Sequence, residues 1–166
     1  MKNNIKKNNS GVTLIETIIA LGILTVGIVS ALSLMISSIT FSQSSEQMIV
    51  VVNLAREGTE SVRSIKDLNG FNSLNNGNYI VDVDGDLILE SANFNGEEII
   101  ENCANCNLYL YNNRYLHNSN GEQTVFKRLI TISSLQSYEK KIISQVYWME
   151  RGREHTFKLE SHITNW

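Results

Sequence analysis

A long apolar stretch near the amino terminus constrains this chain more than any other feature. Residues 17–35 read TIIALGILTVGIVSALSLM, which is nineteen residues without a charge. A membrane-spanning helix needs about 20 mainly apolar residues, so this stretch is long enough to cross a bilayer. Between Val12 and Phe41 the only charge is that of Glu16. The segment must therefore lie in lipid or among other apolar helices.

The charges around this stretch predict its orientation. The preceding residues, MKNNIKKNNSG, carry Lys2, Lys6 and Lys7 and no acid, and the next basic residue after the stretch is Arg56. Because positive residues stay on the cytoplasmic side, we expect the amino terminus inside and everything after about residue 40 exported. No convincing small-residue cleavage site follows the apolar region, which argues against an ordinary secretory signal.

Glu16 requires a physical explanation. An acid within a membrane helix costs roughly 2.5–3.5 kcal/mol on insertion scales, and such a residue normally has a partner. In one interpretation the Glu16 carboxylate lies at the headgroup level and is hydrated. In the other, cleavage after Gly11 leaves a new amino terminus at Val12, and this ammonium group pairs with Glu16. Between neighbouring helices, that pair would set their register.

The junction before the stretch resembles a known processing signal. G-V-T-L-I-E followed by about twenty apolar residues is similar to the class III leader junction of type IV pilins and type II secretion pseudopilins. The resemblance implies that Gly11 precedes the cut, that Val12 is methylated on its nitrogen, and that Glu16 takes part in subunit docking. The usual motif has phenylalanine where this chain has Val12. Major pilins usually carry a proline where this chain has Ser33, so the chain resembles the minor-pilin and pseudopilin branch.

This resemblance implies a structural subunit rather than an enzyme. It implies a minor pilin of a type IV pilus-like filament, held in the cytoplasmic membrane before assembly and in a cell-surface filament afterwards. The implied partners are prepilin peptidase, other pilin subunits, the inner-membrane assembly platform and, before assembly, membrane lipid; no cofactor is expected. One alternative is a pseudopilin of a type II secretion or DNA-uptake system. Another is a single-span membrane protein with a ligand-binding exported head, which predicts an uncut leader and a dispensable Glu16.

The helix is expected to continue beyond the membrane. A helical stripe of apolar and small residues comprises Phe41, Met48, Val51, Ala55, Gly58, Val62 and Ile65. Asp67 to Gly70 supplies a stop signal. The pattern predicts one helix over about residues 13–66, whose second half lays this stripe on a sheet. The absence of proline fits an unbroken helix, and Gly27 with Ala31 would allow close helix approach in lipid.

The remainder reads as strands joined by turns. Candidate strands are Tyr79–Val83, Leu87–Leu89, Asn107–Tyr111, Thr124–Ile132, Lys141–Met149 and Thr156–Ile163, with turns at Asp84–Asp86 and Arg151–Arg153. This order predicts an α+β fold with an antiparallel sheet packed on the long helix, a pilin-like arrangement. The expected segments are a leader at 1–11, a membrane or filament-core helix at 12–40, its amphipathic continuation at 41–67 and an exported β-rich head at 68–166.

Two groups of residues could carry chemistry in the head. Cys103 and Cys106 could form a redox pair, half a metal site, a pair of free thiols or a loop-pinning disulfide, and export favours the disulfide. Asp82, Asp84 and Asp86 alternate as at the start of a calcium loop, with Glu90 as a fourth candidate ligand. The glycine is misplaced for an EF-hand, so a solvated turn is favoured over a metal site.

The other polar residues carry no recognisable catalytic arrangement. His117, His155 and His162 are far apart in sequence and are expected at the surface or at strand edges. Lys127-Arg128 and Lys140-Lys141 are expected on solvated strand faces rather than on a DNA contact. A formal net charge of -3 gives no general reason to expect nucleic-acid binding.

Overall fold

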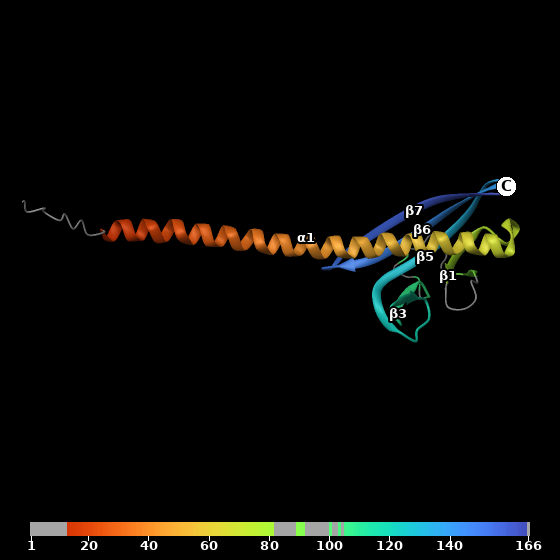
Figure 1. Ribbon diagram of the computed structural model, residues 1–166, viewed down its shortest axis with the longest axis horizontal. Helices are drawn as coiled ribbons and strands as arrows, with labels where there is room; N and C mark the ends of the chain where they lie inside the picture. Colours follow the sequence, from red (N-terminus) through yellow and green to blue (C-terminus); the bar gives the residue numbers. More distant parts are fainter. Residues whose placement is uncertain (1–12, 82–88, 92–99, 101–102, 104, 166) are drawn as a thin grey trace, which may run out of the picture. The chain divides into compact units, whose positions relative to one another are not determined.

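The computed structural model describes residues 13–81, 89–91, 100, 103 and 105–165. One helix, α1 (Leu14–Asn69), precedes a 3₁₀ turn, η1 (Phe71–Ser73), and the strands (Figure 1). The strands are β1 (Gly77–Val81), β2 (Leu89–Ser91), β3 (Asn107–Tyr111), β4 (Arg114–Leu116), β5 (Glu122–Gln136), β6 (Glu139–Glu150) and β7 (Arg153–Thr164). All their pairings are antiparallel, which confirms the predicted α+β fold.

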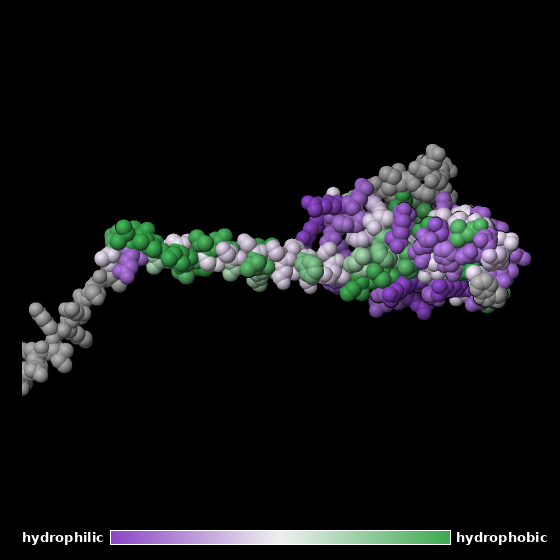
Figure 2. Space-filling model, turned by 90° about the horizontal axis from the view of Figure 1, so that it is seen from above, coloured by the Kyte–Doolittle hydropathy of each residue, from purple (hydrophilic) through white to green (hydrophobic). Residues whose placement is uncertain are grey.

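The chain divides into two compact units, residues 1–46 and 47–166, and α1 contributes to both. In the first unit the large apolar side chains of residues 14–39 are between 49% and 78% exposed. They are coloured green along this part of the helix in Figure 2. Within the described residues, α1 is the one helix long and apolar enough to cross a membrane. An all-round apolar surface of this kind suits lipid or packing against other helices.

The carboxyl end of α1 follows from Gly70. Gly70 has φ of 85° and its N–H donates to the Lys66 carbonyl oxygen at 2.8 Å. A glycine in the left-handed region commonly ends a helix in this way. The helix therefore runs to Asn69, three residues beyond the predicted end, because Gly70, the last residue of the predicted stop signal, is the one that terminates it.

The longest strand, β5, organises the sheet. It pairs with β6 along one side and with β1 and β3 along the other. The β6–β7 ladder continues from Glu150↔Arg153 to Glu139↔Thr164 without a shift in register. Its predicted turn is present: Arg151 and Gly152 have φ of 51° and 75°, as a two-residue hairpin loop requires.

The first four strands of the sheet include one hairpin that was predicted and one strand that was not. The predicted hairpin is present because Tyr79, Ile80 and Val81 pair with Ser91, Glu90 and Leu89, while its turn lies outside the described residues. Strand β4 was not predicted. It follows Asn112 and Asn113, both at positive φ, and a consecutive pair of asparagines is a turn signal that could have indicated it.

The second half of α1 packs on this sheet. Val51, Leu54 and Ala55 join one core cluster with Trp148, and Val62 and Ile65 join another. The predicted stripe is thus correct from Val51 onward and wrong at its start. Met48, one turn earlier, is 41% exposed, and Phe41, in the other unit, is 76% exposed.

Gly58 sets how closely α1 approaches the sheet. A Cβ atom at this position would lie 2.7 Å from both Ile130 Cδ1 and Ser144 Oγ and 3.3 Å from Arg128 Cδ. Those separations are too short for ordinary contact, so only glycine fits without a shift of these neighbours. The helix backbone is thereby brought within hydrogen-bonding reach of Arg128.

Arg128 is fully buried, so the prediction of a solvated face at this residue was wrong. Its Nη1 donates to the Leu54 carbonyl oxygen at 3.2 Å and lies 3.3 Å from Glu57 Oε1, while Nη2 donates to the Val81 carbonyl oxygen at 3.0 Å. Charged groups are buried in proteins only when paired and hydrogen-bonded. This side chain therefore ties α1, β5 and β1 together inside the head.

Candidate functional site

The first turn of α1 contains the residues of the predicted processing and assembly site that the structure describes. The Thr13 carbonyl oxygen accepts the backbone N–H groups of Glu16 at 3.0 Å and Thr17 at 3.2 Å, and Thr13 Oγ1 also accepts the Glu16 N–H at 3.4 Å. Thr13 therefore caps the helix. The spacing of Thr13 and Glu16 is that of a capping box, a local sequence signal from which the start of the helix could have been predicted.

Glu16 is exposed in the first helical turn, where a negative charge is favourable. Gly11 and Val12 lie outside the described residues, so the pairing of an amino terminus at Val12 with Glu16 stays a prediction.

Many of the hydroxyl groups in the first half of α1 are hydrogen-bonded within the helix. Six of them donate to backbone carbonyl oxygens three or four residues earlier: those of Thr17, Thr25, Ser30, Ser33, Thr40 and Ser45. Such bonds remove the cost of burying a hydroxyl in an apolar medium. A carboxylate cannot donate in this way, so Glu16 is the group in this segment whose charge calls for an external partner.

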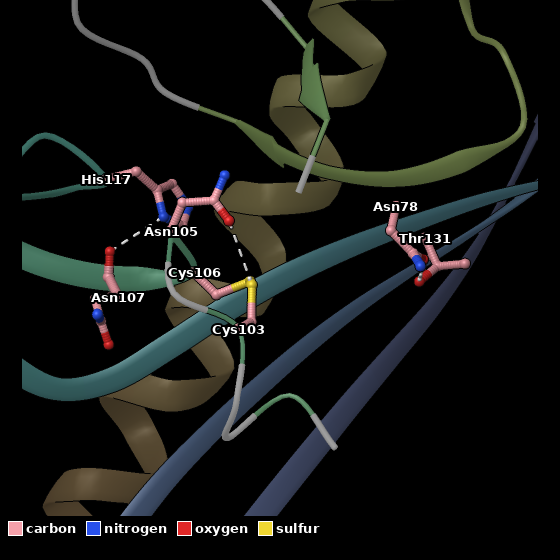
Figure 3. The surroundings of a disulfide bond; sticks show 7 residues. All are labelled: Asn78, Cys103, Asn105, Cys106, Asn107, His117 and Thr131. Atoms are coloured by element: carbon pink, nitrogen blue, oxygen red, sulfur yellow. Dashed lines mark hydrogen bonds between the residues drawn. A yellow bond between two sulfur atoms is a disulfide. The ribbon is translucent and has the colours of Figure 1, made fainter. Parts of the chain in front are cut away.

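In the head, Cys103 and Cys106 are joined in a disulfide (Figure 3). Both are fully buried in a cluster with Ile100, Leu129 and Tyr147. The Cys106 carbonyl oxygen accepts the Arg128 N–H at 2.9 Å, which attaches this segment to β5. The bridge thus pins a segment that covers one face of the sheet.

A redox role for this pair would require a helix after Cys106, as in thioredoxin-like units. The structure instead begins strand β3 at Asn107, directly after the second cysteine. Both sulfur-bearing residues are also inaccessible to solvent. The arrangement supports a structural bridge.

Replacing Cys103 and Cys106 together by alanine is expected to lower the free energy of unfolding of the head by about 2 kcal/mol. This is the value that the loop-entropy relation gives for a four-residue loop. Urea unfolding of the full-length protein in detergent, followed by near-ultraviolet circular dichroism, measures it. A double variant as stable as the unmodified protein would show that the bridge does not hold the covering segment in place.

His117 lies beside this segment and is largely enclosed. Its Nδ1 is 3.2 Å from the Asn107 carbonyl oxygen (Figure 3), a bond in which the ring donates. Burial lowers the pKa of His117 to about 3, and the nearby positive charge of Arg128 acts in the same direction. His117 directly follows the edge strand β4, but the expectation of a surface histidine was wrong here, because the ring is neutral and largely enclosed.

The other two histidines lie at the edge, as expected. His162 Nδ1 is 2.8 Å from Glu139 Oε1 and Nε2 is 3.3 Å from Glu160 Oε1. These two carboxylates raise the pKa of His162, with Glu139 the larger cause. His155 stacks on Trp148, with the ring centroids 5.1 Å apart. The contacts of His162 with Glu139 and of His155 with Trp148 connect β6 with β7.

The other candidate ligand residues and basic residues either lie outside the described part of the chain or already contact protein groups. Asp82, Asp84 and Asp86 lie outside the described residues, as does the side chain of Glu90. Among the described residues no cluster of three or more histidine, cysteine, aspartate or glutamate side chains could hold a metal. Lys140 is engaged with the Leu74 carbonyl oxygen and lies 5.0 Å from the centroid of the Phe71 ring, and Lys141 pairs with Glu160 at 3.5 Å.

Among the cavities on the described part of the head, two have linings that include charged residues. One, of about 270 Å³, is lined by Arg63, Lys66, Asp67, His162, Ile163 and Thr164; the other, of about 380 Å³, is lined by Glu57, Asn113, Arg114 and Tyr115. Small-molecule sites usually measure about 300–1,000 Å³ and are mainly apolar. The first cavity is smaller than that range and the second lies near its lower end, and both are lined largely by charged or polar side chains.

The chain thus combines an apolar amino-terminal helix that is long enough to cross a membrane with an α+β head. Residues 6–32 match the model of the prokaryotic N-terminal methylation motif, the prepilin signal of type IV pilins and pseudopilins. The match supports a type IV pilin or pseudopilin, a structural subunit that prepilin peptidase processes and that assembles with other pilin subunits. No curated protein and no solved structure matches the chain.

Proposed function

We propose that this chain is a minor pilin of a type IV pilus-like filament. Prepilin peptidase cuts after Gly11 and methylates the new amino terminus at Val12. The observation that carries the proposal is the methylation motif at residues 6–32, directly before and within a helix whose large apolar side chains are exposed. The match supports a membrane-anchored subunit that later forms a surface filament.

Assembly then transfers the apolar helix from lipid to the filament core. Apolar side chains lose little in this transfer, because other apolar helices replace the acyl chains. The Glu16 carboxylate would lose water or headgroup contacts, and it regains a partner if a neighbour's amino terminus at Val12 meets it. The pair would thereby penalise any register that leaves Glu16 alone among apolar groups.

The intact mass of the protein from its native membrane or filaments tests the processing step. We expect a chain that begins at Val12 and carries one extra methyl group. A full-length, unmethylated chain from cells with active prepilin peptidase would contradict the proposal. That result would instead favour a single-span anchor with a ligand-binding head.

Changing Glu16 tests the assembly step. We expect Glu16→Ala to be cleaved and methylated normally but to be strongly depleted from filaments, because its helix no longer offers a partner to the neighbouring ammonium group. Ser33→Ala, whose hydroxyl already donates to the Val29 carbonyl oxygen, is the matched control and should assemble normally. The measurement is the ratio of filament-bound to membrane-bound protein. Equal ratios for the two variants would remove Glu16 from the mechanism.

A pseudopilin of a secretion or DNA-uptake system shares these steps. It differs in the machine that receives the subunit, so the same mass and a short, cell-bound assembly would be found. Deleting the chain and measuring secretion, DNA uptake and surface piliation in the same strain separates the two. Loss of secretion or DNA uptake with intact surface pili would favour the pseudopilin.

A further inference from the structure

Asn-Gly sequences occur at four places in the chain: 69–70, 76–77, 95–96 and 120–121. Glycine has no Cβ to hinder its backbone nitrogen and leaves the chain free to rotate. That nitrogen can attack the preceding asparagine side chain when the local structure permits it. Three of the four sites lie within the described residues, and their surroundings differ sharply.

Two of these sites are held in place. Asn69 is the last residue of α1, and the Gly70 N–H is engaged with the Lys66 carbonyl oxygen at 2.8 Å. Asn76 Oδ1 accepts a hydrogen bond from Ser134 Oγ at 2.8 Å, and Gly77 pairs with Ile132 in the sheet. In each case the fold restrains the attacking nitrogen or the amide that it would attack.

The third site is not held in this way. Asn120 is exposed in the connection between β4 and β5, and its backbone N–H donates to Asn118 Oδ1 at 3.1 Å. Among the described groups, neither the Asn120 side-chain amide nor the Gly121 N–H has a hydrogen-bond partner. Both reacting groups are therefore available.

We propose that Asn120 is a site of spontaneous deamidation in the folded protein. The Gly121 nitrogen attacks Asn120 Cγ, a new N–C bond forms, and ammonia leaves with the proton from that nitrogen. Water then opens the cyclic imide at either carbonyl and yields aspartate or isoaspartate. No redox partner is needed.

The product changes the start of β5. It places a new carboxylate two residues before Glu122, which pairs with Leu110 in the β3–β5 ladder. Isoaspartate also inserts an extra methylene into the backbone directly before Gly121. Gly121 has no room to move toward β3, since a Cβ on it would lie 2.5 Å from the Leu110 carbonyl oxygen. The fraction of molecules deamidated at Asn120 should therefore increase with the time since synthesis.

Peptide mapping by mass spectrometry of aged, full-length protein in detergent tests this proposal. One sample is kept folded at mildly alkaline pH, and a second is kept in urea. In the folded sample we expect Asn120 to convert at least about tenfold faster than Asn69 and Asn76, because native structure protects those two. In urea the three rates should become similar.

The Asn120→Gln variant should lose the acidic species that the folded protein accumulates and should keep the same circular dichroism spectrum. Gly121→Ala is unsuitable as a control, because of its contact with Leu110. Conversion of Asn69 or Asn76 as fast as Asn120 in the folded protein would overturn the proposal. So would an Asn120 that stays intact when folded over a period that converts it in urea.

Discussion

Replacing Arg128 by alanine is expected to lower the free energy of unfolding of the head by about 4 kcal/mol. The substitution opens a cavity at a fully buried position, which alone costs about 2–5 kcal/mol for a large side chain. It also removes the donors to the Leu54 and Val81 carbonyl oxygens, and an unsatisfied buried acceptor costs about 1–3 kcal/mol. Urea unfolding of the full-length protein in detergent measures the loss.

Two further variants separate volume from hydrogen bonding at this site. Arg128→Met refills most of the space without the donors, so we expect it to recover about half of the loss. Lys158→Ala removes a cationic side chain from an exposed position of β7 and should change stability by less than about 0.5 kcal/mol. If Arg128→Ala were as mild as Lys158→Ala, Arg128 would not tie α1 to the sheet.

The second large effect is a loss of stability in acid, caused by His117. The folded protein holds this ring neutral with a pKa of about 3, whereas the unfolded chain takes up a proton near the usual value of 6.5. The unfolded state then binds more protons between these two values, so stability falls as pH is lowered through this window. At 1.36 kcal/mol per pKa unit, the total loss approaches roughly 4–5 kcal/mol.

The His117→Asn variant tests this effect. Its amide can still donate toward the Asn107 carbonyl oxygen but does not titrate, so the free energy of unfolding should depend much less on pH between 6.5 and 3. His162→Asn is the matched control. Glu139 and Glu160 raise the pKa of His162, so its contribution is complete at low pH and is lost as pH rises through that raised pKa. A His117→Asn variant with the acid sensitivity of the unmodified protein would contradict this assignment.

Periodicity predicted the elements that are long and regular. The apolar run and the stripe from Val51 to Ile65 predicted α1, because a helix repeats its buried face every three or four residues. The β6–β7 hairpin was equally readable, since its turn sequence requires the positive φ that glycine adopts easily. Short β4 escaped detection because three residues carry too little pattern.

The candidate-site residues differ in the same way: those that belong to a local motif could be predicted, and those whose roles depend on contacts distant in sequence could not. The processing motif is local in sequence, and it was found from a glycine, a glutamate and the apolar run that follows. The interior contacts of Arg128 and His117 are not local. Arg128 looks like half of a surface basic pair until β1, β5 and α1 enclose it, and no spacing rule links it to Glu57. The neutral state of His117 likewise depends on burial that only the assembled sheet supplies.

The direction of the edge strands limits how neighbouring copies of this chain could pair through their sheets. Three strands have a single partner within the described sheet, β2, β4 and β7, and the pairings make all three run in the same direction. Where two copies stack with these strands pointing the same way, their free edges can join only as parallel pairs, which are the weaker kind. An antiparallel pairing of two such edges needs the strands of one copy to point the opposite way. The shared direction of these strands thus disfavours edge-to-edge pairing between copies that are oriented alike, in a chain that has no proline with which to block its edges.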